Sequence, residues 1–138
     1  MKLGSESKHA VKPATYAAIL VTCPTRAEAE ALAEKMVEHH LAGCVNVVPG
    51  IRSIYRWEGK VEKNDEVLLI VKSRMRMLGE LTEFVKENHK YSVPEVIAFS
   101  IRGGNNAYLN WIGANTQIVV EEREITLPDG PPTPPPTE

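Results

Sequence analysis

The sequence predicts a small α+β domain in which two helices cover one face of an antiparallel sheet. Three observations favour this class. Two strand-like runs joined at Glu58-Gly59 form a long hairpin, one amphipathic helical pattern precedes it, and another follows it. Single strand-like runs before the first helix and after the second complete the order β-α-β-β-α-β. This is the split βαβ order of a ferredoxin-like sandwich.

The elements before the hairpin are a strand and a helix. Residues 15–22 (TYAAILVT) are apolar and contain β-branched residues, which is typical of a central strand. Thr25 and Glu28 have the spacing of a capping box at a helix start. Gly43 is the predicted helix stop. The predicted apolar stripe of this helix consists of Ala29, Leu32, Ala33, Met36 and Val37.

The hairpin is the longest predicted feature. Its arms alternate with the period of two that a strand imposes, and Gly59 can adopt the positive φ of a tight turn. Pro49-Gly50 and Asn64-Asp65 interrupt the arms, and we expect bends or bulges at both places. An arm of about 15 residues spans roughly 50 Å, whereas a domain of about 110 residues is only some 35 Å across.

The hairpin should therefore extend beyond its own core and expose apolar side chains, namely Ile51, Ile54, Tyr55 and Trp57. Soluble proteins rarely leave an apolar edge strand uncovered, so we expect other copies of the chain to cover it. Strong bending within a monomer is the alternative. One face of the predicted sheet also lacks helices, which favours a small ring with inward-facing sheets.

The second half of the chain supplies the remaining elements. A helix is predicted over about residues 74–88, with Met77, Leu81, Phe84 and Val85 on one face. Pro94 prevents its continuation, and residues 95–101 form the next strand. Residues 105–114 are expected to form a short helix, and residues 117–124 a last strand.

Three segments follow from these patterns. Residues 1–14 are polar and aperiodic, so we expect a disordered N-terminal arm. Residues 15–125 form the folded domain. Residues 126–138 are expected to be a disordered tail, because six of the last twelve residues are proline.

Composition excludes several classes of protein. Sixteen basic and eighteen acidic residues give a net charge of −2, which argues against nucleic-acid binding. No apolar run reaches the length of a membrane span, and the first residues lack the apolar core of a secretory signal. Cys23 and Cys44 are too few for a disulfide framework, so a reducing, cytoplasmic location is expected.

Four segments of the chain resemble the CutA divalent-cation-tolerance family. They are LAGCVNVVPGIRSIYRWEGKVE, EVLLIVKS, HKYSVPEVIAF and NNAYLNWI, and the match as a whole covers about residues 15–113. The resemblance implies a homotrimer of ferredoxin-like subunits with interlocking hairpins and a fold similar to the PII signalling proteins. It also implies a link to copper and other divalent cations, and no established catalytic activity.

The resemblance also suggests where copper would bind. In some bacterial members, a cysteine on the first strand, a glutamate and a histidine are thought to hold the ion. The glutamate position corresponds to Glu66. The cysteine position corresponds to Val21, with Cys23 two residues later, and the histidine position to Asn88, beside His89. The copper site therefore carries over only in part.

Glu66, His89 and Cys44 are the predicted metal ligands. A carboxylate, an imidazole and a thiolate suit copper or zinc if they converge. Two structural alternatives remain open. Cys44 could be a small buried apolar residue, and His89 could cap the end of the second helix.

A second set of residues suggests a pocket for a small polar or anionic ligand: Trp57, Lys72, Tyr91, Tyr108 and Trp111, together with Tyr55. In the resembling family, such residues line a cleft between subunits. The alternative is that Trp57 and Trp111 anchor subunit contacts.

Two functional hypotheses follow. The first is a non-enzymatic homotrimer that binds divalent cations and acts in metal tolerance. The second is a PII-like regulatory scaffold that binds a small anion, with Lys72 neutralising the charge. An enzyme is not expected, because the sequence offers no nucleophile with a base, no glycine-rich phosphate loop and no Gly-x-Ser-x-Gly motif.

Overall fold

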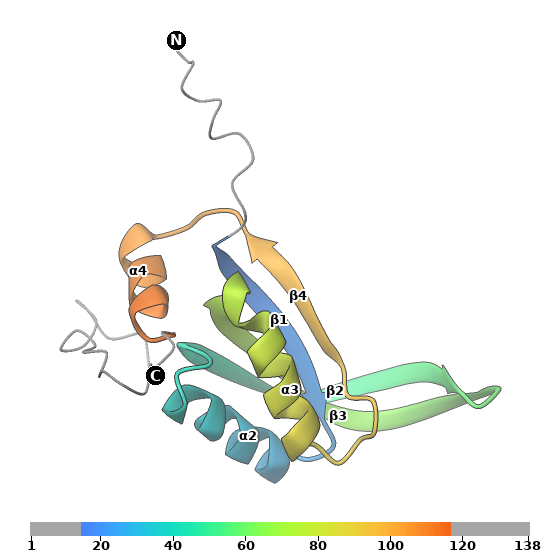
Figure 1. Cartoon of the computed structure of the whole chain (residues 1–138). Helices are drawn as coiled ribbons and strands as arrows, with labels where there is room; N and C mark the ends of the chain where they lie inside the picture. Colours follow the sequence, from blue (N-terminus) through green and yellow to red (C-terminus); the bar gives the residue numbers. More distant parts are fainter. Residues whose placement is uncertain (1–14, 117–138) are drawn as a thin grey trace.

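The computed structural model describes residues 15–116. Its elements follow the predicted β-α-β-β-α-β order, with a further helix at the end (Figure 1). They are β1 (Tyr16–Cys23), α2 (Arg26–Glu38), β2 (Cys44–Trp57), β3 (Lys60–Arg74), a 3-10 turn η1 (Met75–Met77), α3 (Leu78–Asn88), β4 (Val96–Ile101) and α4 (Asn106–Ala114). The predicted strand at 117–124 and both predicted disordered segments lie outside the described residues.

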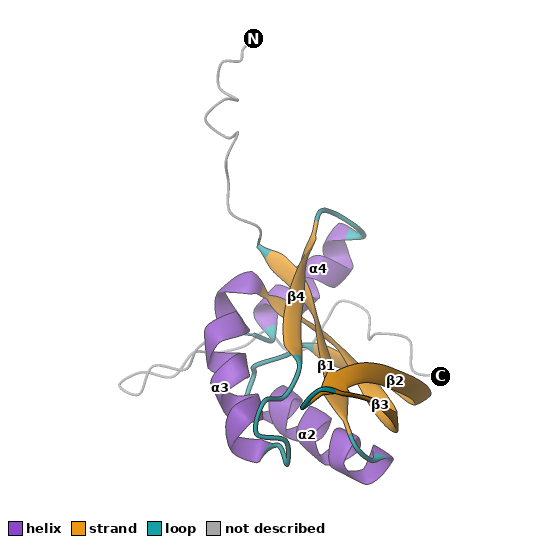
Figure 2. Cartoon of the chain, turned by 90° about the vertical axis from the view of Figure 1, so that its right-hand side faces the viewer, coloured by secondary structure: helices purple, strands orange, loops and turns teal. Residues whose placement is uncertain are grey.

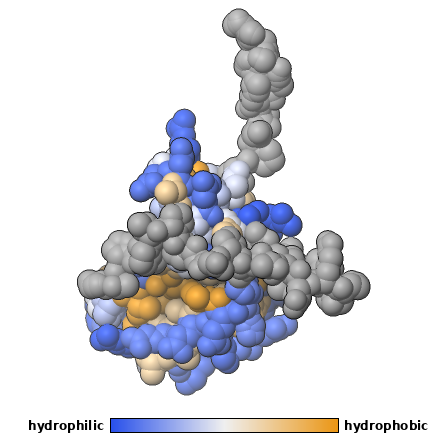
Figure 3. All heavy atoms as spheres, turned by 90° about the vertical axis from the view of Figure 1, so that its left-hand side faces the viewer, coloured by the Kyte–Doolittle hydropathy of each residue, from blue (hydrophilic) through white to orange (hydrophobic). Residues whose placement is uncertain are grey.

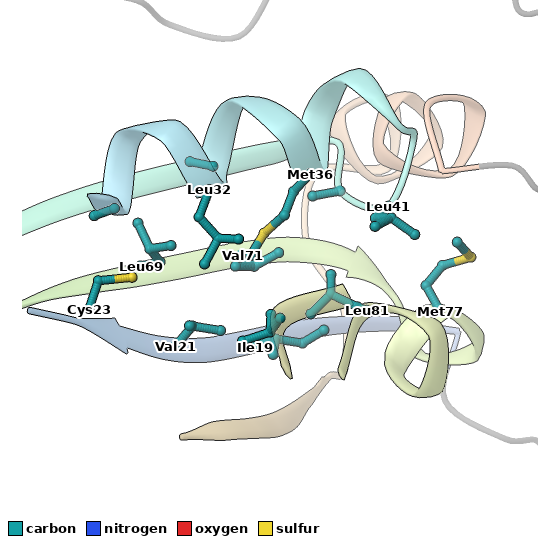
Figure 4. Packing of buried hydrophobic residues seen from close by; sticks show 14 of the residues in the cluster. Ile19, Val21, Cys23, Leu32, Met36, Leu41, Leu69, Val71, Met77 and Leu81 are labelled. Carbon is teal, nitrogen blue, oxygen red and sulfur yellow. The ribbon is translucent and has the colours of Figure 1, made fainter. Parts of the chain in front are cut away.

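The four strands form one antiparallel sheet in the order β2-β3-β1-β4. Helices α2 and α3 lie on one face of it, as Figure 2 shows. The hydrophobic core fills the layer between these helices and the sheet (Figure 4). Most of its largest fully buried side chains come from α2, α3 and the two central strands, and they include Ile19, Met36, Leu69, Val71 and Leu81. The predicted α+β class is confirmed.

The start of α2 is confirmed and its end differs from the prediction. The Thr25 hydroxyl accepts a hydrogen bond from the Glu28 amide at 3.2 Å, as the capping motif requires. The helix ends at Glu38, with His39 as its C-cap, rather than at Gly43. His40 has a φ of +59°, and the amide of Leu41 donates back to the Met36 carbonyl at 2.9 Å. This Schellman-type end buries Leu41 beside Met36 in the core, which a stop at Gly43 would not do.

One residue of the predicted apolar stripe on α2, Val37, is not buried. Ala29, Leu32, Ala33 and Met36 are buried, but the side chain of Val37 is 42 % exposed. Val37 lies at the margin of the stripe, because each helical residue turns the chain by about 100°. It faces a groove shared with Val45 and Val47 of β2.

The hairpin extends beyond the rest of the domain, as predicted (Figure 1). Glu58 and Gly59 both have positive φ, so two residues connect Trp57 to Lys60 in a type I′ turn. The register shifts between Val48 and Ile51, which confirms the bulge expected at Pro49-Gly50.

The interruption predicted at Asn64-Asp65 is wrong, because both residues stay in register with β2. Two cross-strand contacts favour the regular pairing. Arg52 forms an ion pair with Asp65 at 2.8 Å, and the Asn64 amide donates to the Tyr55 hydroxyl. Without a proline or glycine in this arm, nothing in the backbone requires a bulge.

Apolar side chains remain exposed on the sheet and on the hairpin. Ile97 and Phe99, on the sheet face without helices, are 46 % and 55 % exposed. The hairpin exposes Ile54 and Trp57. Figure 3 shows the side opposite the hairpin, where a further apolar patch has a hydrophilic border. Within residues 15–116, no helix combines the length and apolarity needed to cross a bilayer.

Candidate functional site

A cleft of about 530 Å³ lies where the hairpin meets the body of the domain. The hairpin, the end of β1 and the loop between α3 and β4 all contribute to it. Its lining consists of Thr22, Ser53, Ile54, Tyr55, Trp57, Glu66, Tyr91, Ser92, Val93 and Glu95. Four predicted site residues therefore meet here: Tyr55, Trp57, Tyr91 and Glu66.

Glu66 is the buried acidic group of the cleft. It lies on β3 opposite Ile51, just after the bulge, and only 8 % of it is exposed. The Tyr91 hydroxyl donates a hydrogen bond to Glu66 Oε2 at 2.8 Å. Burial, this hydrogen bond and the nearby carboxylate charge raise the pKa of Tyr91 well above its usual range. Tyr91 therefore stays a hydrogen-bond donor at neutral pH.

Glu95 is a second carboxylate in the cleft, which the sequence reasoning missed. Burial and the charge of Glu66 raise its pKa. Among the described residues, no lysine, arginine or histidine lines the cleft. The site therefore has a negative potential and favours a cation over an anion.

His89 lies behind the cleft and fixes the position of Tyr91. Its Nε2 is 2.7 Å from the Thr22 carbonyl, and its Nδ1 accepts the backbone N–H of Tyr91 at 3.1 Å. A carbonyl only accepts, so Nε2 carries the proton and the Nδ1 lone pair faces Tyr91. The two rings also pack with centroids 4.7 Å apart.

Cys44 and Lys72 lie elsewhere on the sheet. They pair directly with each other, six residues along β3 from Glu66, or about 20 Å at ~3.4 Å per residue. The Lys72 ammonium donates to the Asn46 side chain. One chain therefore does not bring Cys44 to Glu66, nor Lys72 to Trp57 and Tyr91.

The other two predicted pocket residues also lie outside the cleft. Burial, followed by interaction with the Cys44 side chain, raises the pKa of Tyr108 to about 12. The rings of Tyr108 and Trp111 pack with centroids 5.7 Å apart. The predicted pocket set thus divides into two separate groups.

The copper positions inferred from the resemblance also have structural roles. Val21 is fully buried in the core, and the Asn88 amide donates to the Phe84 carbonyl at 2.8 Å. Burial, followed by the charges of Glu28 and Glu66, raises the pKa of the Cys23 thiol to about 11. Across residues 15–116, no three His, Cys, Asp or Glu side chains are placed to hold one metal ion.

Fold and site together define a small α+β sandwich with a projecting hairpin and an acidic, aromatic cleft at its base. Residues 17–115 match the family model described as CutA1 divalent ion tolerance protein. The chain belongs to this CutA1 family.

Known proteins of this family resemble the chain in sequence. The chloroplastic Protein CutA of Arabidopsis thaliana is 50 % identical over 99 residues, which are 72 % of this chain and 54 % of the relative. The chain thus spans about half the length of that plant relative. The divalent-cation tolerance protein CutA of Thermus thermophilus is 46 % identical over 98 residues, 71 % of this chain and 95 % of the relative.

Solved structures of CutA proteins also resemble the chain. The divalent cation tolerance protein of Thermus thermophilus superposes with a TM-score of 0.73 at 44 % identity, covering 74 % of this chain and 99 % of that one. CutA1 from Oryza sativa superposes with a TM-score of 0.74 at 48 % identity, covering 75 % and 95 %.

Proposed function

We propose that this protein binds a divalent cation in the cleft, without catalysis, and contributes to metal tolerance as a homotrimer. The single observation that carries the cation proposal is Glu66, a carboxylate that is only 8 % exposed and lines the cleft close to Glu95. A buried carboxylate is costly unless a positive charge or hydrogen bonds compensate for it. Among the described residues, the Tyr91 hydroxyl is the group that donates to it.

The identity of the ion depends on which ligands join Glu66. Oxygen ligands suit Mn²⁺, Mg²⁺ or Ca²⁺, whereas copper prefers nitrogen or sulfur. Glu66 and Glu95 supply oxygen only. Copper, the ion implied by the family resemblance, would need His89 to release the Tyr91 amide from Nδ1. Cys44 is beyond the reach of that ion within one chain.

Calorimetric titration with Cu²⁺, Zn²⁺ and Mn²⁺ tests this proposal. Glu66→Gln should abolish the heat for all three ions, because the variant keeps the shape and removes the charge. His89→Ala should weaken the binding of Cu²⁺ and Zn²⁺ more than that of Mn²⁺, because only the first two ions favour nitrogen ligands. Glu62→Gln on the exposed part of β3 is the matched control. Metal binding that survives Glu66→Gln unchanged would refute the site.

The homotrimer is supported by exposed apolar surface in two places. The sheet face without helices exposes Ile97 and Phe99, and the hairpin exposes Ile54 and Trp57. Isolated subunits rarely keep such surface in water. A solution mass three times the chain mass of 15.3 kDa is expected by light scattering, and a monomer at low concentration would contradict it.

The alternative function, a PII-like scaffold that binds a small anion, has less support. Lys72 was its expected anion-binding group, but it lies about 20 Å along β3 from the cleft. Titrating ATP into the wild-type protein and into Lys72→Ala separates the two hypotheses. Only the anion hypothesis expects a heat of ATP binding that Lys72→Ala removes. A cytoplasmic location stays a prediction, which fractionation of cells that express the chain would test.

A further inference from the structure

Strand β2 forms one edge of the sheet, and among residues 15–116 no strand lies beside its outer side (Figure 2). Before the bulge, this open edge consists of Cys44–Val48, with the sequence CVNVV. Edge strands of natural proteins are usually protected by charged residues or proline, and this stretch contains neither. An apolar edge of this kind requires a cover.

An apolar groove of about 430 Å³ runs beside this edge, on the helix side of the sheet. It is lined by Ala33 and Val37 of α2 and by Val45 and Val47 of β2. Val45 and Val47 pair with buried core residues of β3, so their side chains point towards the helices. The groove is therefore separate from the helix-free face and from the apolar end of the hairpin, which support the homotrimer.

The helix wall of the groove is acidic. Glu30, Glu34 and Glu38 line it at successive turns of α2, and among the described residues no basic side chain joins them there. A segment that enters the groove must therefore place apolar side chains in it and keep its own carboxylates outside.

The described residues end at the start of this groove. A Cβ on Gly43, just before β2, would lie 2.9 Å from Ile112 Cδ1, so α4 packs closely against the start of the edge strand. His40 Nδ1 donates to the Asn115 carbonyl at 3.4 Å, and Thr116 is buried. The next residue of the chain therefore starts beside the first residues of β2.

Residues 117–124 (QIVVEERE) are the predicted strand that lies outside the described residues. An extended segment of this length spans about 26 Å, whereas the open edge of β2 spans about 17 Å. In a strand, Ile118 and Val120 share one face, which offers two aliphatic side chains to the groove. The glutamates of the segment all follow Val120, so pairing of the first half alone keeps them out of the acidic groove.

From these observations we propose that residues 117–120 pair with the outer edge of β2 in the same chain and place Ile118 and Val120 in the groove. The attachment at Thr116 favours this occupant over a second copy, because a segment joined next to its site has an effective concentration in the millimolar range. The docked segment closes the open edge of the sheet. This inference goes beyond the proposed function and requires no bound cation.

Hydrogen exchange of the full chain, followed by NMR, tests the pairing. The amides of Cys44–Val48 that point away from β3 should be protected in the wild type. Ile118→Asp introduces a charge into the acidic groove and should speed their exchange at least about tenfold. Ile125→Asp is the matched control, because it makes the same change just beyond the segment, and it should leave their exchange unchanged.

Nuclear Overhauser contacts in the wild type show which chain supplies the segment. A sample refolded from a mixture of ¹⁵N-labelled and ¹³C-labelled chains separates contacts within one chain from contacts between copies. We expect contacts between residues 118–120 and Cys44–Val48 within one chain. This measurement does not depend on the folding of any variant.

Each of the following results would overturn the inference. Free exchange of the outer amides in the wild type would show that the edge is uncovered. Protection that survives Ile118→Asp, in a variant shown to be folded by circular dichroism, would show that another copy covers the edge. Overhauser contacts found only between differently labelled chains would place the segment on a neighbouring subunit.

Discussion

The hydrogen bond from Tyr91 to Glu66 gives the most quantitative prediction about the cleft. Tyr91→Phe removes the hydroxyl that lies 2.8 Å from Glu66 Oε2 and leaves the buried carboxylate without this donor. Hydrogen bonds to charged groups contribute about 1.5–3 kcal/mol, so we expect the free energy of unfolding to fall by about 2 kcal/mol. For a folded region of this size, this corresponds to a Tm lower by roughly 10 °C.

Urea denaturation at pH 7, followed by far-UV circular dichroism, measures this loss. Tyr55→Phe is the matched control, because the Tyr55 hydroxyl also lies in the cleft but contacts the neutral Asn64 side chain. It should cost only about 0.5–1 kcal/mol. Equal losses for the two variants, or no loss for Tyr91→Phe, would show that Tyr91 does not stabilise a charged Glu66.

The same contact predicts a pH dependence at the alkaline end. The pKa of Tyr91 is raised in the folded protein, first by burial and then by its bond to Glu66. Its contribution is therefore complete below the unfolded tyrosine value of about 10 and is lost as pH rises above it. Wild-type stability should fall above about pH 10, and Tyr91→Phe should fall less steeply over the same range. Parallel curves would contradict this assignment.

Two further predictions concern other parts of the fold. Gly43→Ala should cost about 1–3 kcal/mol in urea denaturation, because the new Cβ would lie 2.9 Å from Ile112 Cδ1 and 3.2 Å from its Cα; a neutral effect would mean that α4 does not pack there. In iodoacetamide labelling at pH 8, Cys44 should react well before Cys23, whose buried thiol has a pKa raised to about 11. Peptide mass spectrometry measures both rates, and equal rates would contradict the burial of Cys23.

Local signals in the sequence predicted most of the fold. The type I′ turn needed Gly59, the bulge needed Pro49-Gly50, and the helix start needed the Thr25 hydroxyl. Each of these signals acts within a few residues. The predicted end of α2 at Gly43 was wrong because His40 adopts a left-handed conformation that glycine normally provides. There the burial of Leu41 outweighs the local preference for glycine.

The candidate site was harder to predict, because it depends on strand order and register. Alternation places Glu66 on one face of β3, but only the pairing shows that Glu66 lies opposite Ile51 and that Cys44 lies opposite Lys72. Glu95 shares the parity of Ile97 and Phe99, so strand alternation places it on the sheet face without helices. A proposed strand order could have brought it near Glu66, but the sequence alone does not supply that order.

The position of the bound cation tests the central claim most directly. Mn²⁺ broadens the NMR signals of nearby nuclei, so a titration on isotopically labelled protein maps the ion onto the chain. We predict that the amide signals of Glu66, Tyr91 and Glu95 broaden first, while those of Cys44 and Lys72 persist. Broadening centred on Cys44, or spread evenly over the surface, would contradict the assignment of the cleft as the cation site.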